Sequence, residues 1–234
     1  MKYLPTWLAK WKREGLAWHE RETRMFEGFN TEIAEKMNQG EAPESFVTDL
    51  IQTENRHKLS KKESAWLAGN MVSAGSETTS STLENFILIM IHHPEVMRKA
   101  QAEIDSVVGR ERPPLLQDRS YLPYIGAVMK ELLRWRPAAP IGLPRRATED
   151  NWYEGHFIPK GTTVIGNIWD PSIFPDFDTY RPERWLDAAG KLKPAPPDTH
   201  QMGHLSFGFG RRNCPGMYFA DQALFIAELL ANKE

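Results

Sequence analysis

Apolar residues recur every three to four positions along much of the chain, with charged residues between them. This spacing predicts amphipathic helices over residues 5–38, interpreted as a packed pair. The apolar positions of this stretch are Trp7, Trp11, Trp18, Met25, Phe26, Phe29, Ile33 and Met37. A polar loop is expected over residues 39–45, and Ser45 is suited to begin a short helix over residues 46–52.

A longer helical pattern extends from about residue 60 to 92. Ser60 and Glu63 have the spacing of a capping box at its start, and Pro94 follows its end. Small and hydroxyl-bearing residues occupy positions 74–81, where Ala or Leu would favour a helix more strongly. Such a run is typical of a solvated or bent stretch of helix.

The remaining pattern predicts two more helices and a small β region. Apolar spacing indicates helices over residues 95–108 and about 121–135. Residues 151–167 favour a hairpin-like pair, with Trp152–Tyr153 opposite 162–165. We therefore expect a mainly α fold with a small β portion, in a single domain.

Composition narrows the class of protein. The 234 residues are 41% hydrophobic and 26% charged, which is typical of a folded globular chain. A net charge of -2 gives no overall attraction to nucleic acid. The single cysteine rules out a disulfide within the chain. No signal-peptide pattern or apolar run long enough to span a membrane occurs.

The single cysteine, Cys214, lies in the segment Phe-Gly-Phe-Gly-Arg-Arg-Asn-Cys-Pro-Gly over residues 207–216. Glycines permit backbone conformations closed to other residues and close approach to a flat ligand. The glycines of this loop are Gly208, Gly210 and Gly216. Pro215 suits the start of a helix over about 217–231. A sulfur at a helix N-terminus is favoured as a thiolate, so Cys214 is a candidate ligand or nucleophile.

An isolated cysteine is more often a small buried hydrophobe than a ligand. Zinc and iron–sulfur sites need several protein ligands, and this chain offers no second cysteine. A lone thiolate therefore points to a metal whose other positions are already filled, as in haem. Arg211 and Arg212 precede the sulfur and could pair with a haem propionate.

The loop resembles the ligand loop FxxGxRxCxG of the cytochrome P450 family of haem-thiolate monooxygenases. The matching residues are Phe207, Gly210, Arg212, Cys214 and Gly216. The resemblance implies that Cys214 binds the iron of haem b (iron protoporphyrin IX) and that the other four residues contact the cofactor. It further implies a partial cytochrome P450 fold, namely the C-terminal half of a eukaryotic, fungal-type microsomal member.

Within the helix over 60–92, Ala74-Gly-Ser-Glu-Thr-Thr79 resembles the family signature A-G-x-E-T-T. This helix crosses the distal face of the haem in the family. Glu77 and Thr78 then correspond to the acid–alcohol pair that orders water and delivers protons. Ala74 and Gly75 are expected to contact substrate, and the resemblance makes residues 1–234 one partial haem domain.

Glu131 and Arg134 form an E-x-x-R pattern, whose i, i+3 spacing allows an ion pair. This pattern alone is weak, and an exposed ion pair is its ordinary explanation. The segment Arg181-Pro-Glu-Arg-Trp185 resembles the P-E-R-F/W segment of the family. The resemblance implies a buried network of Glu131, Arg134 and Arg184 that supports the ligand loop.

The connection after this helix is non-helical and lined with small apolar groups. By resemblance Arg145 holds a haem propionate, with Arg146 as the alternative. Ala138, Ala139 and Ile141 are expected to contact substrate.

The resemblance implies oxidation, such as hydroxylation, of a small lipophilic substrate by dioxygen. Electrons would come from NADPH through NADPH–cytochrome P450 reductase, since no dinucleotide fingerprint is present. The complete protein would lie on the endoplasmic reticulum through an N-terminal anchor absent from this chain. Two alternatives remain: a haem-thiolate isomerase or peroxygenase, and a truncated, catalytically incompetent product that keeps these motifs but cannot hold haem.

Two departures from the family bear on these expectations. Family members usually have several more residues between the positions of Trp169 and Asp170, so a supporting segment is expected to be distorted here. A complete member is also roughly twice as long as this chain.

Overall fold

The structure is a computed structural model that describes residues 4–196, 199 and 201–233. Most of the ordered structure is helical, and the strands are short, as expected for a mainly α fold with a small β portion. The chain divides into two compact units, residues 1–76 and 77–234. No helix of the described ranges is long and apolar enough to cross a bilayer.

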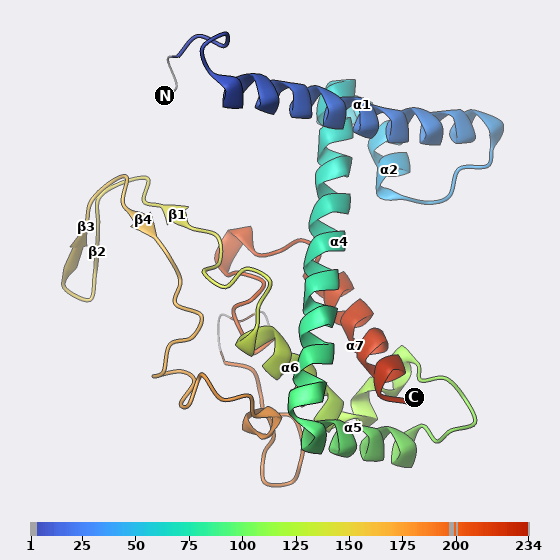
Figure 1. The fold of residues 1–234 in the computed structure, drawn as a ribbon, viewed down its shortest axis with the longest axis vertical. Helices are drawn as coiled ribbons and strands as arrows, with labels where there is room; N and C mark the ends of the chain where they lie inside the picture. Colours follow the sequence, from blue (N-terminus) through green and yellow to red (C-terminus); the bar gives the residue numbers. More distant parts are fainter. Residues whose placement is uncertain (1–3, 197–198, 200, 234) are drawn as a thin grey trace. The chain divides into compact units, whose positions relative to one another are not determined.

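The first unit contains α1 (Lys10–Gln39), α2 (Phe46–Gln52), α3 (Glu54–His57) and the first half of α4 (Lys61–His92) (Figure 1). The prediction of two packed helices over residues 5–38 is wrong, because α1 is one helix of 30 residues. Glycine weakens a helix without ending it, and no proline interrupts this stretch after Pro5. The helix ends at Gly40, whose φ of 77° is the left-handed conformation typical of a C-terminal cap.

Side-chain caps begin α2 and α4. The Ser45 hydroxyl accepts the Thr48 amide at 3.1 Å, which confirms the predicted start of α2. At α4 the Ser60 hydroxyl accepts the Glu63 amide at 3.2 Å, and the Glu63 carboxylate accepts the Ser60 amide at 2.8 Å. This reciprocal pair is the predicted capping box. The short helix α3 was not predicted.

An aromatic contact holds α1 against the start of α4. The Trp66 indole donates to the Thr23 hydroxyl at 2.9 Å, and Phe26 meets the Trp66 ring edge-on at 5.2 Å. A Cβ atom at Gly69 would lie 2.4 Å from the Phe26 ring. Only glycine therefore permits the two helices to pack this closely.

The second unit packs α5 (Pro94–Val107), α6 (Pro123–Trp135) and α7 (Met217–Lys233) around a common core. Fully buried apolar side chains come from all three helices, including Ile104, Ile125, Met129, Leu224 and Phe225. The 3-10 helix η1 (Leu116–Tyr121) leads into α6. Burying such a core supplies most of the favourable free energy of folding, and it fixes α6 and α7 together.

The N-terminus of α6 is capped from α5. The Glu103 carboxylate accepts the amides of Tyr124 and Ile125 at 2.9 and 3.0 Å. Burial raises the pKa of Glu103, and these two hydrogen bonds oppose that shift. The contact satisfies amides that a helix start leaves without partners.

Four short strands form two antiparallel pairs. Strand β1 (Arg145–Arg146) pairs with β4 (Thr163–Val164), and β2 (Asn151–Tyr153) pairs with β3 (His156–Ile158). The predicted pairing of Trp152–Tyr153 with residues 162–165 is therefore wrong. Glu154 and Gly155 both have positive φ, which makes a tight two-residue turn and places β3 directly opposite β2.

Candidate functional site

The site is built around the segment before α7 that holds Cys214. Gly208 and Gly210 have φ values of 78° and 64°, which other residues rarely adopt. The φ of Gly216 is not positive, and a Cβ there would lie 3.9 Å from the Cys214 sulfur; its predicted contact with the cofactor stays a prediction. The 3-10 helix η3 (Gly210–Arg212) completes the bend.

Cys214 is a free, half-buried cysteine three residues before α7 begins at Met217. Its amide donates to the carbonyl of Phe207 at 2.8 Å, which closes the loop on itself. Its carbonyl accepts the Met217 amide at 3.4 Å in the first turn of α7. Within the described ranges, no group of three or more His, Cys, Asp or Glu side chains could hold a metal. A single sulfur suits a metal that arrives with its other ligands in place.

Arg145 reaches this loop from β1. Its Nη2 atom donates to the carbonyl oxygens of Phe209 and Arg212 at 3.2 and 3.4 Å. The guanidinium also lies 5.3 Å from the centre of the Phe209 ring. Arg212 is exposed on the loop surface. Arg145 and the loop are thus adjacent, while propionate binding by either arginine stays a prediction.

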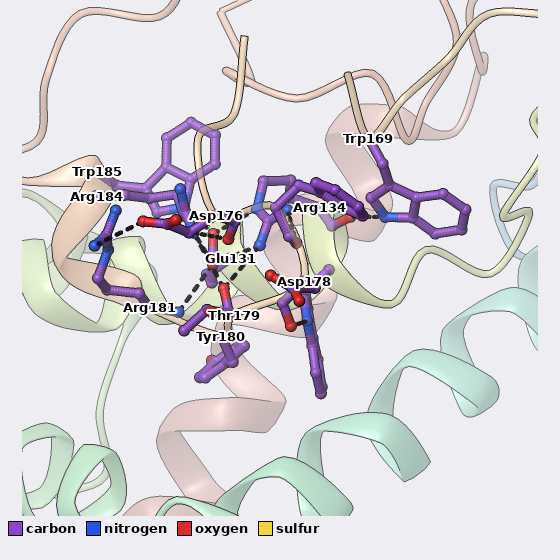
Figure 2. A network of polar contacts seen from close by, with 12 residues as sticks. Glu131, Arg134, Trp169, Asp176, Asp178, Thr179, Tyr180, Arg181, Arg184 and Trp185 are labelled. Carbon is purple, nitrogen blue, oxygen red and sulfur yellow. Dashed lines mark hydrogen bonds and ion pairs between the residues drawn. The ribbon is translucent and has the colours of Figure 1, made fainter. Parts of the chain in front are cut away.

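Glu131 and Arg134 form a buried ion pair on α6 (Figure 2). Their side chains are 0% and 1% exposed, and Arg134 donates Nε and Nη2 to the two carboxylate oxygens at 2.8 and 2.7 Å. Arg184 joins them, with Nε 2.9 Å from Glu131. The structure therefore brings together the three side chains that the sequence suggested as a network.

Further donors complete the network. The Trp185 indole and the Arg181 amide each donate to Glu131 at 2.9 Å. Arg134 and Arg184 also donate hydrogen bonds to backbone carbonyls of the segment 175–179. Every charge in this core has direct partners, which is the condition under which burying it is tolerable. The network fastens the segment 175–185 to α6.

The C-terminal end of α6 contacts the loop region directly. The Ser206 hydroxyl donates to the Leu133 carbonyl at 2.5 Å, and the Trp169 indole donates to the Arg134 carbonyl at 3.1 Å. Lys130 donates to the Met202 carbonyl upstream of the loop. Sequence reasoning missed Ser206 and Lys130, because a side chain that bonds to a distant carbonyl leaves no local pattern. Distortion beside Trp169 stays a prediction.

His204, two residues before Ser206, is fully enclosed. Its ring lies 5.7 Å from that of Phe207, and its Nδ1 atom accepts the Ser206 amide at 3.4 Å. Burial, together with the positive charges of Lys130 and Arg134, lowers the pKa of His204 to about 3. The imidazole is therefore neutral at ordinary pH and serves as packing and as an acceptor.

The remaining candidate residues are exposed. Glu77 and Thr78 lie on the surface of α4, where Thr82 donates to the Thr78 carbonyl at 2.8 Å. Ala74 and Gly75 are exposed on the same helix, and a Cβ at Gly75 would meet no described atom within 4 Å. Ala138, Ala139 and Ile141 are exposed in the connection after α6. The catalytic and substrate roles of all these residues stay predictions.

The described residues thus form a mainly helical fold with a half-buried cysteine in a glycine-bent loop before α7 and a buried Glu–Arg network on α6. The model of the cytochrome P450 family matches residues 1–231. The chain belongs to the cytochrome P450 family.

Three similar curated relatives come from the fungi Postia placenta and Armillaria gallica. Cytochrome P450 monooxygenases 58 and 253 of Postia placenta are each 56% identical over 230 residues. A cytochrome P450 monooxygenase of Armillaria gallica is 46% identical over 231 residues. These alignments cover 97% of this chain and 44% of each relative. The chain therefore spans less than half the length of the relatives it matches.

Proposed function

We propose that this chain forms the haem-thiolate part of a monooxygenase that oxidises a small lipophilic substrate. The observation that carries the proposal is the geometry of Cys214, a half-buried free thiol whose amide is bonded to the Phe207 carbonyl. Cys214 would ligate the iron, and Phe207, Gly210 and Gly216 would face the macrocycle. Bound haem would supply the activation of dioxygen.

The residues present fit this group. Gly208 and Gly210 carry no Cβ atom and therefore adopt positive φ in the bend of the loop, which suits close approach to a flat ligand. Arg145 lies against the same loop and Arg212 belongs to it, so propionates would find cationic partners. The Glu131 network would support the loop indirectly, by holding the segment 175–185 against α6. It would not contact substrate.

Glu77 and Thr78 would manage protons. Their exposure on α4 leaves both side chains accessible to water, which a proton-delivering pair requires. Ala74, Gly75, Ala138, Ala139 and Ile141 would shape the substrate surface with small apolar groups. NADPH would supply electrons through a separate reductase, and a segment outside this chain would anchor the protein to the endoplasmic reticulum.

A second candidate function is that of a fragment without activity of its own. The observation in its favour is the exposure of apolar side chains along the second half of α4, where Ile87, Leu88 and Ile91 are 58%, 53% and 70% exposed. Contiguous apolar surface of this kind is usually covered by other structure. A haem-thiolate isomerase or peroxygenase is less favoured, because such enzymes often dispense with the acid–alcohol pair.

A chimaera tests the proposal. Residues 1–234 would replace the matching part of the 56% identical Postia placenta relative, which supplies the remaining length. We expect the purified chimaera to contain haem and to give the red-shifted Soret band of a ferrous carbonyl thiolate complex. A chimaera that folds but has no such band contradicts the proposal.

A further inference from the structure

Ser206 immediately precedes the loop 207–216 and is bonded to α6. Its hydroxyl donates to the Leu133 carbonyl at 2.5 Å, across 73 positions of sequence. The serine is half-buried, so this bond is partly shielded from water. It is a direct link between the start of the cysteine loop and the helix that carries Glu131 and Arg134.

The acceptor belongs to the last turn of α6, where a helix leaves four carbonyl groups without partners inside the helix. The other three have donors outside the cysteine loop. The Arg136 amide donates to the Leu132 carbonyl at 2.9 Å. The Trp169 indole donates to the Arg134 carbonyl and the Arg136 guanidinium to the Trp135 carbonyl, both at 3.1 Å. Among these four acceptors, only Leu133 takes its donor from a residue adjoining the loop.

The next residue along the chain, Phe207, is the partner of Cys214. The Phe207 carbonyl accepts the Cys214 amide at 2.8 Å. Holding the Ser206 side chain therefore restrains the neighbouring residue whose carbonyl accepts the Cys214 amide. Two hydrogen bonds, from Ser206 to Leu133 and from Cys214 to Phe207, therefore connect α6 to the cysteine through adjacent residues.

We propose that Ser206 is a positioning residue, which holds the Phe207 carbonyl and thereby Cys214 in place against α6. The importance of that placement rests on the proposed function, in which Cys214 ligates haem. The bond itself does not depend on that function. A competing explanation is that Ser206 only caps α6 and has no special effect on the cysteine.

A matched pair of variants separates the two explanations. Ser206→Ala removes the donor to Leu133, whereas Trp169→Phe removes the donor to the adjacent Arg134 carbonyl and leaves the loop contact intact. Both changes take one cap from the same helix turn. Only Ser206→Ala also removes the hydrogen bond between α6 and the residue before the loop.

Cys214 reports the result without haem, because it is the single cysteine of the chain. The rate of its alkylation by iodoacetamide is measured in the 234-residue chain, with global stability measured by urea unfolding. Losing one partly buried hydrogen bond corresponds to an acceleration of about five- to tenfold in Ser206→Ala. We expect Ser206→Thr, which keeps the hydroxyl, to restore the slow rate, and Trp169→Phe to leave it unchanged after correction for stability.

If the 234-residue chain alone is alkylated as fast as an unfolded chain, the chimaera with the Postia placenta relative provides an independent measurement. There the readout is the rate at which the thiolate-type carbonyl band disappears in mild urea, expected to rise for Ser206→Ala and not for Trp169→Phe. Equal effects of the two variants, or no effect of Ser206→Ala, overturn the proposal. Absence of the band in the unsubstituted chimaera contradicts the haem proposal instead, and the alkylation result still decides the role of Ser206.

Discussion

Glu131 and Arg134 are almost fully buried and pair through two hydrogen bonds of 2.7 and 2.8 Å. A carboxylate and a guanidinium oriented in this way form a strong, directional contact. Arg184, Trp185 and the Arg181 amide add three more donors to the same carboxylate (Figure 2). The pair therefore fixes a separate segment of chain to α6, beyond stabilising the helix itself.

Glu131→Gln should destabilise the protein strongly. The substitution leaves two buried guanidinium groups without their counter-charge, and breaking a buried pair in this way costs about 3–5 kcal/mol. Urea unfolding of the chimaera measures the loss. Glu32→Gln, which breaks the exposed pair with Lys36 on α1, is the control and should cause no measurable loss. Similar effects of the two substitutions would contradict the assigned importance of the network.

Acid should destabilise the protein through His204. Its pKa is about 3 when folded and near 6.5 when unfolded, so the unfolded chain binds more protons between these values. The stability from keeping this imidazole neutral is present above pH 6.5 and falls with pH down to about 3. At 1.36 kcal/mol per pH unit, the loss between pH 7 and 5 is about 2 kcal/mol.

His204→Asn removes this titration and keeps an acceptor near the Ser206 amide. We expect the variant to have a flatter stability profile between pH 7 and 5 than the unsubstituted protein, as measured by urea unfolding at each pH. His93, which is less buried and whose ring centre lies 5.2 Å from that of Tyr180, provides the control through His93→Asn. An unchanged pH profile for His204→Asn would show that another group controls acid stability.

Thr78→Ala should leave haem binding intact and divert electrons from substrate to free hydrogen peroxide. The proposed role of this hydroxyl is to manage protons, and it does not hold the cofactor. The measurement is product formed per NADPH consumed by the chimaera with a reductase. Thr79→Ala, one position along α4 and about 100° around the helix, is the control. Undiminished coupling in Thr78→Ala would refute the role.

Local signals in the sequence predicted the helix starts well. Ser45 and the Ser60–Glu63 pair cap the helices that they were expected to begin, because a cap is set by residues three positions apart. The E-x-x-R pair was predictable for the same reason. Its burial was suggested only by resemblance to the cytochrome P450 family.

Contacts between side chains and distant backbone carbonyls were not predictable. The carbonyl partners of Arg134 at Phe177 and Thr179, and of Ser206 at Leu133, depend on how the chain folds back and not on residue type. The predicted strand pairing is wrong because the tight Glu154–Gly155 turn selects β3, and not residues 162–165, as the partner of β2. The continuous α1 shows that interior glycines do not by themselves divide a helix.

The 234-residue chain alone should not be a competent enzyme. Apolar surface left in water costs about 25 cal/mol per Å², so a few hundred Å² is comparable with the stability of a domain. The exposed positions Ile87, Leu88 and Ile91 illustrate such surface on α4. Titration with haemin should give aggregation or weak binding open to solvent, and coupled turnover with a reductase would show this prediction to be wrong.

The central claim is that the Cys214 sulfur ligates haem iron, and the ferrous carbonyl spectrum tests it most directly. The spectrum is recorded for the haem-loaded chimaera and for its Cys214→Ala variant. We predict the red-shifted thiolate band in the unsubstituted protein and its complete loss in Cys214→Ala, since the loop 207–216 offers no comparable ligand. An identical red-shifted band in both proteins would contradict the account.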